Sequence, residues 1–229
     1  MGEEYPGVPL VRDGEAAVAC TRTRRWPPPG IRPAGATRAP AASLTRVITG
    51  GAASGDHPPG ELLRLRPLRL DDEAAFRAAH QVMAAEGFIF GFGLEPATRW
   101  DTYLKALQDH RCGLNLAGGR VPATFLVADA AGVIVGRASI RHELNDRLKQ
   151  KGGHIGYAVL PPYRRRGYGT EILRQSLVIA RASGVDRVLL TCDDDNAGSI
   201  AVIERCGGRL DSVTGLKHSA VPVRRYWID

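Results

Sequence analysis

The sequence predicts an α/β (α+β) fold for residues 61–229. Segments with strand and helix periodicity alternate along this part of the chain, in the order strand, two helices, three strands, helix, strand, helix, strand. In addition, an apolar strand, a glycine-rich turn, a helix and a second apolar run follow one another directly. Such a unit joins two parallel strands by a right-handed crossover.

Residues 1–60 contrast with this domain. They are crowded with Pro, Gly, Ala, Arg and Thr and show no sustained period. A segment of this composition does not bury enough apolar area to offset its chain entropy. We therefore expect a disordered extension over 1–60, with a basic tethering arm or a wrongly assigned start site as the alternatives, and a single domain over 61–229.

The first elements of the domain are a strand and two helices. Leu63 and Leu65 alternate with arginines and predict a strand. Apolar residues over 76–83 have helical spacing, and Gly87 ends that helix. A second helical pattern starts near Pro96.

Two strands, 124–128 and 133–140, come next, and the turn 129–132 between them predicts a hairpin. A polar loop over 141–153 then leads into an apolar strand, 154–160.

A helix from residue 170 to Gly184 is expected next, with Leu173 and Leu177 on one face. The continuous apolar run 188–192 reads as a strand buried on both faces. The acidic run before Asn196 caps a further helix, and apolar pieces at the end of the chain close the sheet.

The turn before the longest helix reads RRRGYGT over residues 164–170. Gly167 and Gly169 let the backbone turn sharply and approach a ligand closely. The N–H groups at the helix start and the helix dipole favour an anion, so the turn can hold a phosphate or pyrophosphate. A solvated basic turn is the alternative, and neither a Walker loop nor a complete GxGxxG unit is present.

The spacing Arg164-x-x-Gly167-x-Gly169 resembles the pyrophosphate loop of the GNAT superfamily of acyl-CoA-dependent N-acyltransferases. The strand before the turn and the helix that begins at Asn196 extend the resemblance over residues 61–229. It implies a mixed, mostly antiparallel sheet of six to seven strands, with a central parallel pair and about four helices on both faces.

The resemblance also implies acetyl-CoA as the co-substrate and no metal. The pantetheine arm would lie between the two parallel strands, and a backbone N–H near Val159 would polarise the thioester carbonyl. The residues that would bind the cofactor are Ala158, Val159, Leu160, Arg164, Arg165, Arg166, Gly167, Tyr168, Gly169, Thr170, Asn196 and Ser199.

The attacking amine must be neutral, so the site needs a base that takes its proton. In the family a glutamate often stands where this chain has His154, which either acts as the base or simply ends a strand. Glu143 and His142 are the reserve candidates.

The departing thiolate usually receives a proton from a tyrosine seven residues after Asn196, where this chain has Ile203. Ser199, Cys192, Tyr226 or water are the alternative donors. A covalent role for Cys192 is disfavoured, because a buried strand cysteine is usually inert.

We therefore expect an N-acetyltransferase that moves an acetyl group to a primary amine by direct attack in a ternary complex. A catalytically weak acyl-CoA sensor on the same fold is one alternative. A nucleic-acid-binding protein is the other, because the formal net charge is +7. No zinc or RNP pattern supports nucleic acid.

Several expectations concern the surroundings of the protein. The chain shows no apolar run long enough to span a bilayer and no signal-peptide core, so we expect a cytoplasmic protein without a membrane partner. The acceptor is expected to be a small molecule or a peptide, and a homodimer is possible.

Overall fold

The computed structural model describes residues 63–215 and 220–229, so the predicted extension over 1–60 lies outside the described residues. The helices and strands, with two short 3-10 turns, follow in chain order: β1 (Arg64–Arg66), η1 (Leu70–Asp72), α1 (Glu73–Ala84), α2 (Trp100–Arg111), β2 (Ala123–Ala130), β3 (Val133–Arg141), α3 (Asp146–Gln150), β4 (Ile155–Val159), η2 (Pro161–Tyr163), α4 (Tyr168–Ala182), β5 (Val188–Asp193), α5 (Ala197–Arg205), β6 (Arg209–Thr214) and β7 (Val223–Ile228).

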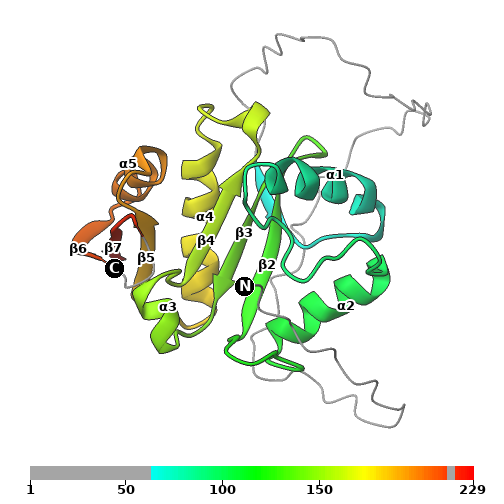
Figure 1. Cartoon of the computed structure of the whole chain (residues 1–229), viewed down its shortest axis with the longest axis horizontal. Coiled ribbons are helices and arrows are strands. Elements are labelled where there is room, and N and C mark those ends of the chain that lie inside the picture. The colour runs from blue at the N-terminus through cyan, green and yellow to red at the C-terminus, as the bar shows by residue number, and fades with distance from the viewer. Residues whose placement is uncertain (1–62, 216–219) are drawn as a thin grey trace, which may run out of the picture.

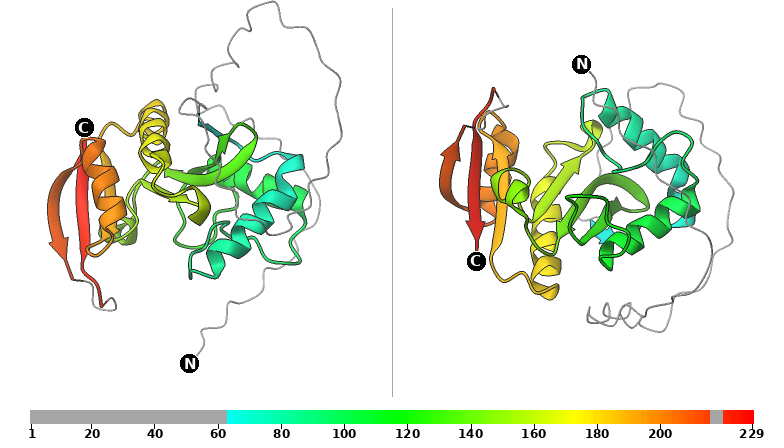
Figure 2. Two further views of the ribbon diagram at one scale, coloured as in Figure 1. Left: turned by 90° about the horizontal axis from the view of Figure 1, so that it is seen from above. Right: turned by 60° about the horizontal axis from the view of Figure 1, so that its bottom comes forward.

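The strands form two antiparallel sheets. The first has the order β1-β2-β3-β4 and the second the order β5-β7-β6. Figure 2 shows the second sheet, in orange and red, standing to one side of the first. The mixed α/β fold predicted from the sequence is confirmed.

The expected parallel pair is β4 and β5, which run in the same direction away from α3 (Figure 1). The backbone N–H of His154 donates to the carbonyl oxygen of Leu189 at 2.7 Å, where the two strands begin. A Cβ at Gly153 would lie 2.4 Å from that same oxygen, so only glycine allows this approach. Farther along, β4 and β5 belong to different sheets and diverge.

Helices cover both faces of the first sheet. Helix α4 packs on one face, where Ile172, Leu173 and Leu177 are buried. Helices α1 and α2 cover the other face around Phe76, which is fully buried among aromatic rings. Its ring contacts are Phe90, Trp100, Tyr103 and Phe125, with centroids 5.3 to 6.0 Å away.

The predicted hairpin of β2 and β3 is confirmed, with Asp129 Oδ1 accepting the Gly132 N–H at 2.8 Å in the turn. The polar loop over 141–153 differs from the prediction, because it contains α3. This helix has only five residues and buries only Leu148, so it leaves no periodic signal. Helix α2 also begins later than Pro96, because the Glu95 N–H is held by the Thr98 hydroxyl in a preceding turn.

Among the described residues, no helix is long and apolar enough to cross a membrane.

Candidate active site

A cavity of about 590 Å³ lies between the end of β4, the start of α4 and one side of α5. Its lining is Met83, Phe88, Tyr157, Ala158, Val159, Tyr163, Arg164, Arg165, Gly167, Gly169, Thr170, Asn196, Gly198, Ser199, Ala201, Val202 and Arg205. The glycine turn, Asn196 and Ser199, all predicted to bind the cofactor, therefore meet at one cavity. Leu160, Arg166 and Tyr168 do not line it.

The glycine turn has the geometry of an anion site. Gly167 is the N-cap of α4 with φ +82°, and Arg165 before it also has a positive φ of 64°. The N–H of Thr170 already donates to the Gly167 carbonyl at 3.1 Å. The amides of residues 165–169 are therefore the candidates for binding a phosphate.

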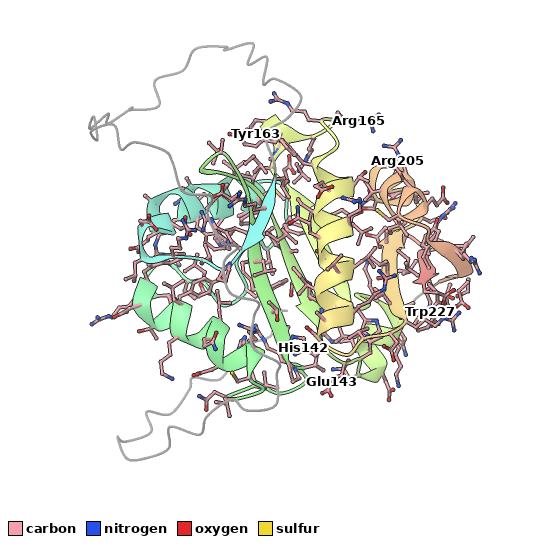
Figure 3. The ribbon with its side chains drawn as sticks, turned by 180° about the vertical axis from the view of Figure 1, so that it is seen from behind. His142, Glu143, Tyr163, Arg165, Arg205 and Trp227 are labelled. Carbon is pink, nitrogen blue, oxygen red and sulfur yellow. The ribbon has the colours of Figure 1, made fainter. Side chains whose placement is uncertain are left out.

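The three arginines of the turn have different surroundings. The guanidinium of Arg164 donates to Glu86 on the α1 side, with Nη1 3.2 Å from Oε1, and through Nε to the Val159 carbonyl at 3.1 Å. Arg166 lies over the Tyr163 ring, 5.8 Å from its centroid. Arg165 lines the cavity and lies at the same end of the molecule as Arg205 of α5 (Figure 3). The cavity is therefore positively charged at this end.

Among the described residues, no strand pairs with β4 on the side away from β3, although Arg164 Nε occupies the Val159 carbonyl there. The Leu160 N–H donates to Val135 of β3 at 2.9 Å. Because hydrogen-bonding groups alternate along an antiparallel strand, the N–H and C=O of Val159 and Tyr157 face the diverging side. The amide of Leu160 is thus already used, while that of Val159 remains available for a ligand.

The opposite wall is built by the start of α5. Asn196 Oδ1 accepts the Ser199 N–H at 2.9 Å and caps the helix, while both residues line the cavity. Next to them, the Tyr157 hydroxyl is buried without a hydrogen-bond partner among the described residues. Burial raises the pKa of Tyr157 to about 12, and the Ser199 side chain acts against this rise. The two hydroxyls are thus close neighbours, although no hydrogen bond of acceptable geometry joins them.

The family model described as "Acetyltransferase (GNAT) domain" matches residues 63–209 of the chain. The chain belongs to the GNAT acetyltransferase family. It is accordingly an acetyl-CoA-dependent acetyltransferase. Comparison with proteins of curated function finds no match.

Solved GNAT structures share the fold at low sequence identity. The yncA protein of Salmonella typhimurium, solved with its cofactor acetyl-CoA, is 17% identical with a TM-score of 0.50 over 72% of this chain and 92% of its own. A GNAT acetyltransferase from Streptococcus pneumoniae is 17% identical with a TM-score of 0.51 over 73% and 98%. The microcin C7 self-immunity acetyltransferase MccE, in complex with acetyl-CoA and AMP, is 17% identical with a TM-score of 0.50 over 74% and 93%.

His154, the first candidate base of this GNAT enzyme, does not line the cavity. Its side-chain Nδ1 accepts the backbone N–H of Leu189 at 2.9 Å. Burial lowers the pKa of His154, so the imidazole is neutral, and a neutral imidazole that accepts at Nδ1 carries its proton on Nε2. No lone pair is then left for an amine proton, which favours the alternative that His154 ends a strand.

The reserve candidates lie elsewhere. Figure 3 shows His142 and Glu143 at the opposite end of the sheet from Tyr163 and Arg165. The His142 ring contacts the Thr124 hydroxyl at 2.9 Å. Of the predicted catalytic residues, only Ser199 lines the cavity.

The remaining proton-donor candidates do not line the cavity. Ile203, in the place of the family's tyrosine, is 1% exposed and belongs to the core. Burial raises the pKa of the Cys192 thiol to about 11, which makes it a poor nucleophile. The Tyr226 hydroxyl donates to Glu204 at 3.1 Å.

Several lining residues escaped the sequence analysis, above all Tyr157 and Arg205. Arg205 could have been found, because it follows Gly198 and Val202 at the i, i+4, i+7 spacing of one face of α5. Tyr157 gives no such signal, since its place beside Ser199 depends on how β4 and α5 approach each other. No group of three or more metal-ligating side chains occurs in the described part of the chain.

Proposed function

We propose that the enzyme transfers the acetyl group of acetyl-CoA to a primary amine on a small molecule or a peptide, by direct attack in a ternary complex. The observation that carries this proposal is the cavity between β4, α4 and α5, which combines a glycine turn, an open strand edge and a positively charged end. These are the features that a long, polyanionic thioester requires.

The cofactor would bind by its main-chain and phosphate groups. The amides of 165–169 and the side chains of Arg165 and Arg205 would hold the pyrophosphate. The pantetheine arm would run along the diverging side of β4, where Val159 offers its N–H. That N–H would stabilise the oxyanion formed when the amine attacks the thioester carbonyl.

For the leaving sulfur, we propose Ser199 with Tyr157 beside it. The hydroxyl of Ser199 would donate a hydrogen bond to the thiolate, and the Tyr157 hydroxyl would supply a hydrogen bond to Ser199 in turn. A tyrosine whose pKa is about 12 stays protonated at every working pH. It therefore acts as a constant hydrogen-bond donor rather than as a titrating acid.

The acceptor amine would approach on the side of Phe88, which lines the cavity from the α1–α2 side. Since the Nδ1 lone pair of His154 is already used, the amine proton would leave to water that enters with the acceptor.

Release of CoA thiol from acetyl-CoA, measured with a panel of primary amines, tests the proposal. Turnover with at least one amine, together with an acetylated product of the expected mass, supports transfer. The buried Ile203 in place of a tyrosine favours the rival, a CoA-binding sensor. Tight acetyl-CoA binding without turnover for any amine would establish that rival.

A further inference from the structure

Two arginines of β3, Arg137 and Arg141, lie on the sheet face covered by α1 and α2. Arg137 is only 3% exposed. Its Nη1 donates to the Gly156 carbonyl and its Nη2 to the Ile89 carbonyl, both at 3.2 Å. Its Nε is buried without a partner among the described residues. The guanidinium carbon lies 4.9 and 4.7 Å from the ring centroids of Phe88 and Phe92.

This buried charge has no counter-anion in the part of the chain that the structure describes. The charged group that most affects Arg137 after burial is Arg141, another cation, and Arg141 in turn faces Arg147. Burial and this repulsion lower the pKa of Arg137 to about 9. A buried cation is costly unless it is paired, so the arrangement lacks an anion.

The two guanidiniums lie beside Gly156, the second residue of β4. Arg141 also donates through Nη1 to the carbonyl oxygens of Gly152 and Gly153, at 3.0 and 2.9 Å. A Cβ at this position would lie 3.6 and 3.7 Å from Nη2 and Nη1 of Arg141, and 3.8 Å from Nη1 of Arg137. Gly156 itself is partly exposed. These are ordinary contact distances, so the glycine leaves room beside both arginines for a group of about the size of a methyl group.

The arginines do not line the cavity of the proposed acyl-transfer site, but two of their neighbours do. Phe88 lines the cavity and also stacks on Arg137. Ala158, which pairs with Arg137 across the strands, lines the cavity as well. Gly156 and Ala158 are two residues apart on one face of β4, or about 7 Å. An acceptor with its amine at the thioester would therefore have to extend past Phe88 and Ala158 to reach the arginines.

We propose that Arg137 and Arg141 bind an oxyanion of the acceptor, so that the preferred acceptors are amines that carry a carboxylate or a phosphonate, such as amino acids. This inference rests on the proposed acetyl transfer. Guanidinium forks match both kinds of oxyanion by paired hydrogen bonds, and the Phe88 and Phe92 rings hold the Arg137 fork in place. A purely structural arginine would have all its buried donors satisfied, which Arg137 does not.

The test compares acceptors that differ in the anion, at equal concentrations of the neutral amine. We would measure kcat/KM for an amino acid, its methyl ester, its decarboxylated amine and the corresponding aminophosphonate. The expected result is a preference of roughly 10- to 100-fold for an anionic acceptor over the ester and the decarboxylated amine, as for hydrogen bonds to charged groups. Whichever of the amino acid and the aminophosphonate reacts faster identifies the oxyanion.

Arg137→Met and Arg141→Met should each lower kcat/KM for the anionic acceptors more than for the decarboxylated amine, and so remove the preference. Arg147→Met, on the exposed side of α3, is the matched control and should keep the preference. Arg141 is less buried than Arg137, so its variant serves if Arg137→Met fails to fold. Equal kcat/KM values for anionic and neutral acceptors, or an unchanged preference in Arg141→Met, would overturn the inference.

Failure of the proposed function is a separate outcome. If no amine is acetylated, the melting temperature of the CoA-bound wild type still tests the arginine site. Stabilisation by the amino acid or the aminophosphonate, absent with the decarboxylated amine and absent in Arg141→Met, would support the oxyanion site. No stabilisation by either anion would reject it.

Discussion

The imidazole of His154 accepts the backbone N–H of Leu189 through Nδ1 at 2.9 Å, while the His154 backbone N–H donates to the Leu189 carbonyl at 2.7 Å. One residue at the start of β4 thus satisfies both main-chain groups of one residue of β5. Beyond this point the strands separate into different sheets. His154 therefore holds β4 and β5 together at the point from which the two strands diverge.

His154→Ala should destabilise the protein by about 1–3 kcal/mol, because it leaves the buried Leu189 N–H without its acceptor. The KM for acetyl-CoA should rise, while the shape of the pH–rate profile should stay the same. Chemical denaturation and steady-state kinetics at several pH values measure these effects. Loss of a pH-dependent limb in the variant would instead return His154 to the role of base.

The stability of the wild type should fall as the pH drops below about 6.5. Burial lowers the pKa of His154 from the usual 6.5, so the unfolded chain takes up a proton that the folded chain does not. The stabilisation that neutral His154 contributes is present in full above the pKa of this histidine in the unfolded chain. It declines as the pH falls below that value. Melting temperatures at pH 7.5 and 5.5 should therefore differ less in His154→Ala than in the wild type. His142 and His110 remain in both proteins and cancel in this comparison. An equal difference in both proteins would show that His154 does not titrate on unfolding.

Gly169→Glu should weaken acetyl-CoA binding by more than about 100-fold, because it brings a carboxylate into a site for phosphates. A side chain here would also approach Val202, since a Cβ added at Gly169 would lie 3.3 Å from the Val202 Cγ2. Gly118→Glu adds the same charge where nothing lies within 4 Å and is the control. Calorimetric titration with CoA measures both variants, and unchanged affinity in Gly169→Glu would remove the glycine turn from the site.

Tyr157→Phe should lower kcat without lowering the melting temperature. The hydroxyl it removes is buried without a partner among the described residues, so its loss costs the fold nothing. Ser199→Ala should lower kcat by a comparable factor, roughly 10- to 100-fold for a hydrogen bond to a charged group, and the double variant should be little worse than either single one. Ser212→Ala on β6 is the control. Additive losses in the double variant would mean that the two hydroxyls act separately.

Deletion of residues 1–60 should leave kcat/KM for acetyl-CoA unchanged, since the match to the GNAT family begins at residue 63 and the cavity is built after it. The same deletion tests the nucleic-acid alternative. Salt-sensitive binding of single- or double-stranded DNA by the full chain, lost in the deletion, would assign residues 1–60 to nucleic acid.

The conformation of the glycine turn could be predicted, because it depends on adjacent residues, 164–170, and is set locally. The pairing of β2 with β3 was predictable for the same reason. Tyr157 beside Ser199, and Arg137 beside Gly156, were not predictable, because each pair comes from separate elements that meet only in the folded chain. For His154 the sequence was misleading. Its position suggested a catalytic base, whereas its hydrogen bond with Leu189 indicates that it holds two strands together.

A crystal structure with CoA tests the central claim most directly. We predict that the pyrophosphate lies on the amides of residues 165–169, and that the sulfur lies between Val159 of β4 and Ser199 of α5. A CoA molecule bound elsewhere, or one whose sulfur does not enter the gap between β4 and α5, would contradict this account.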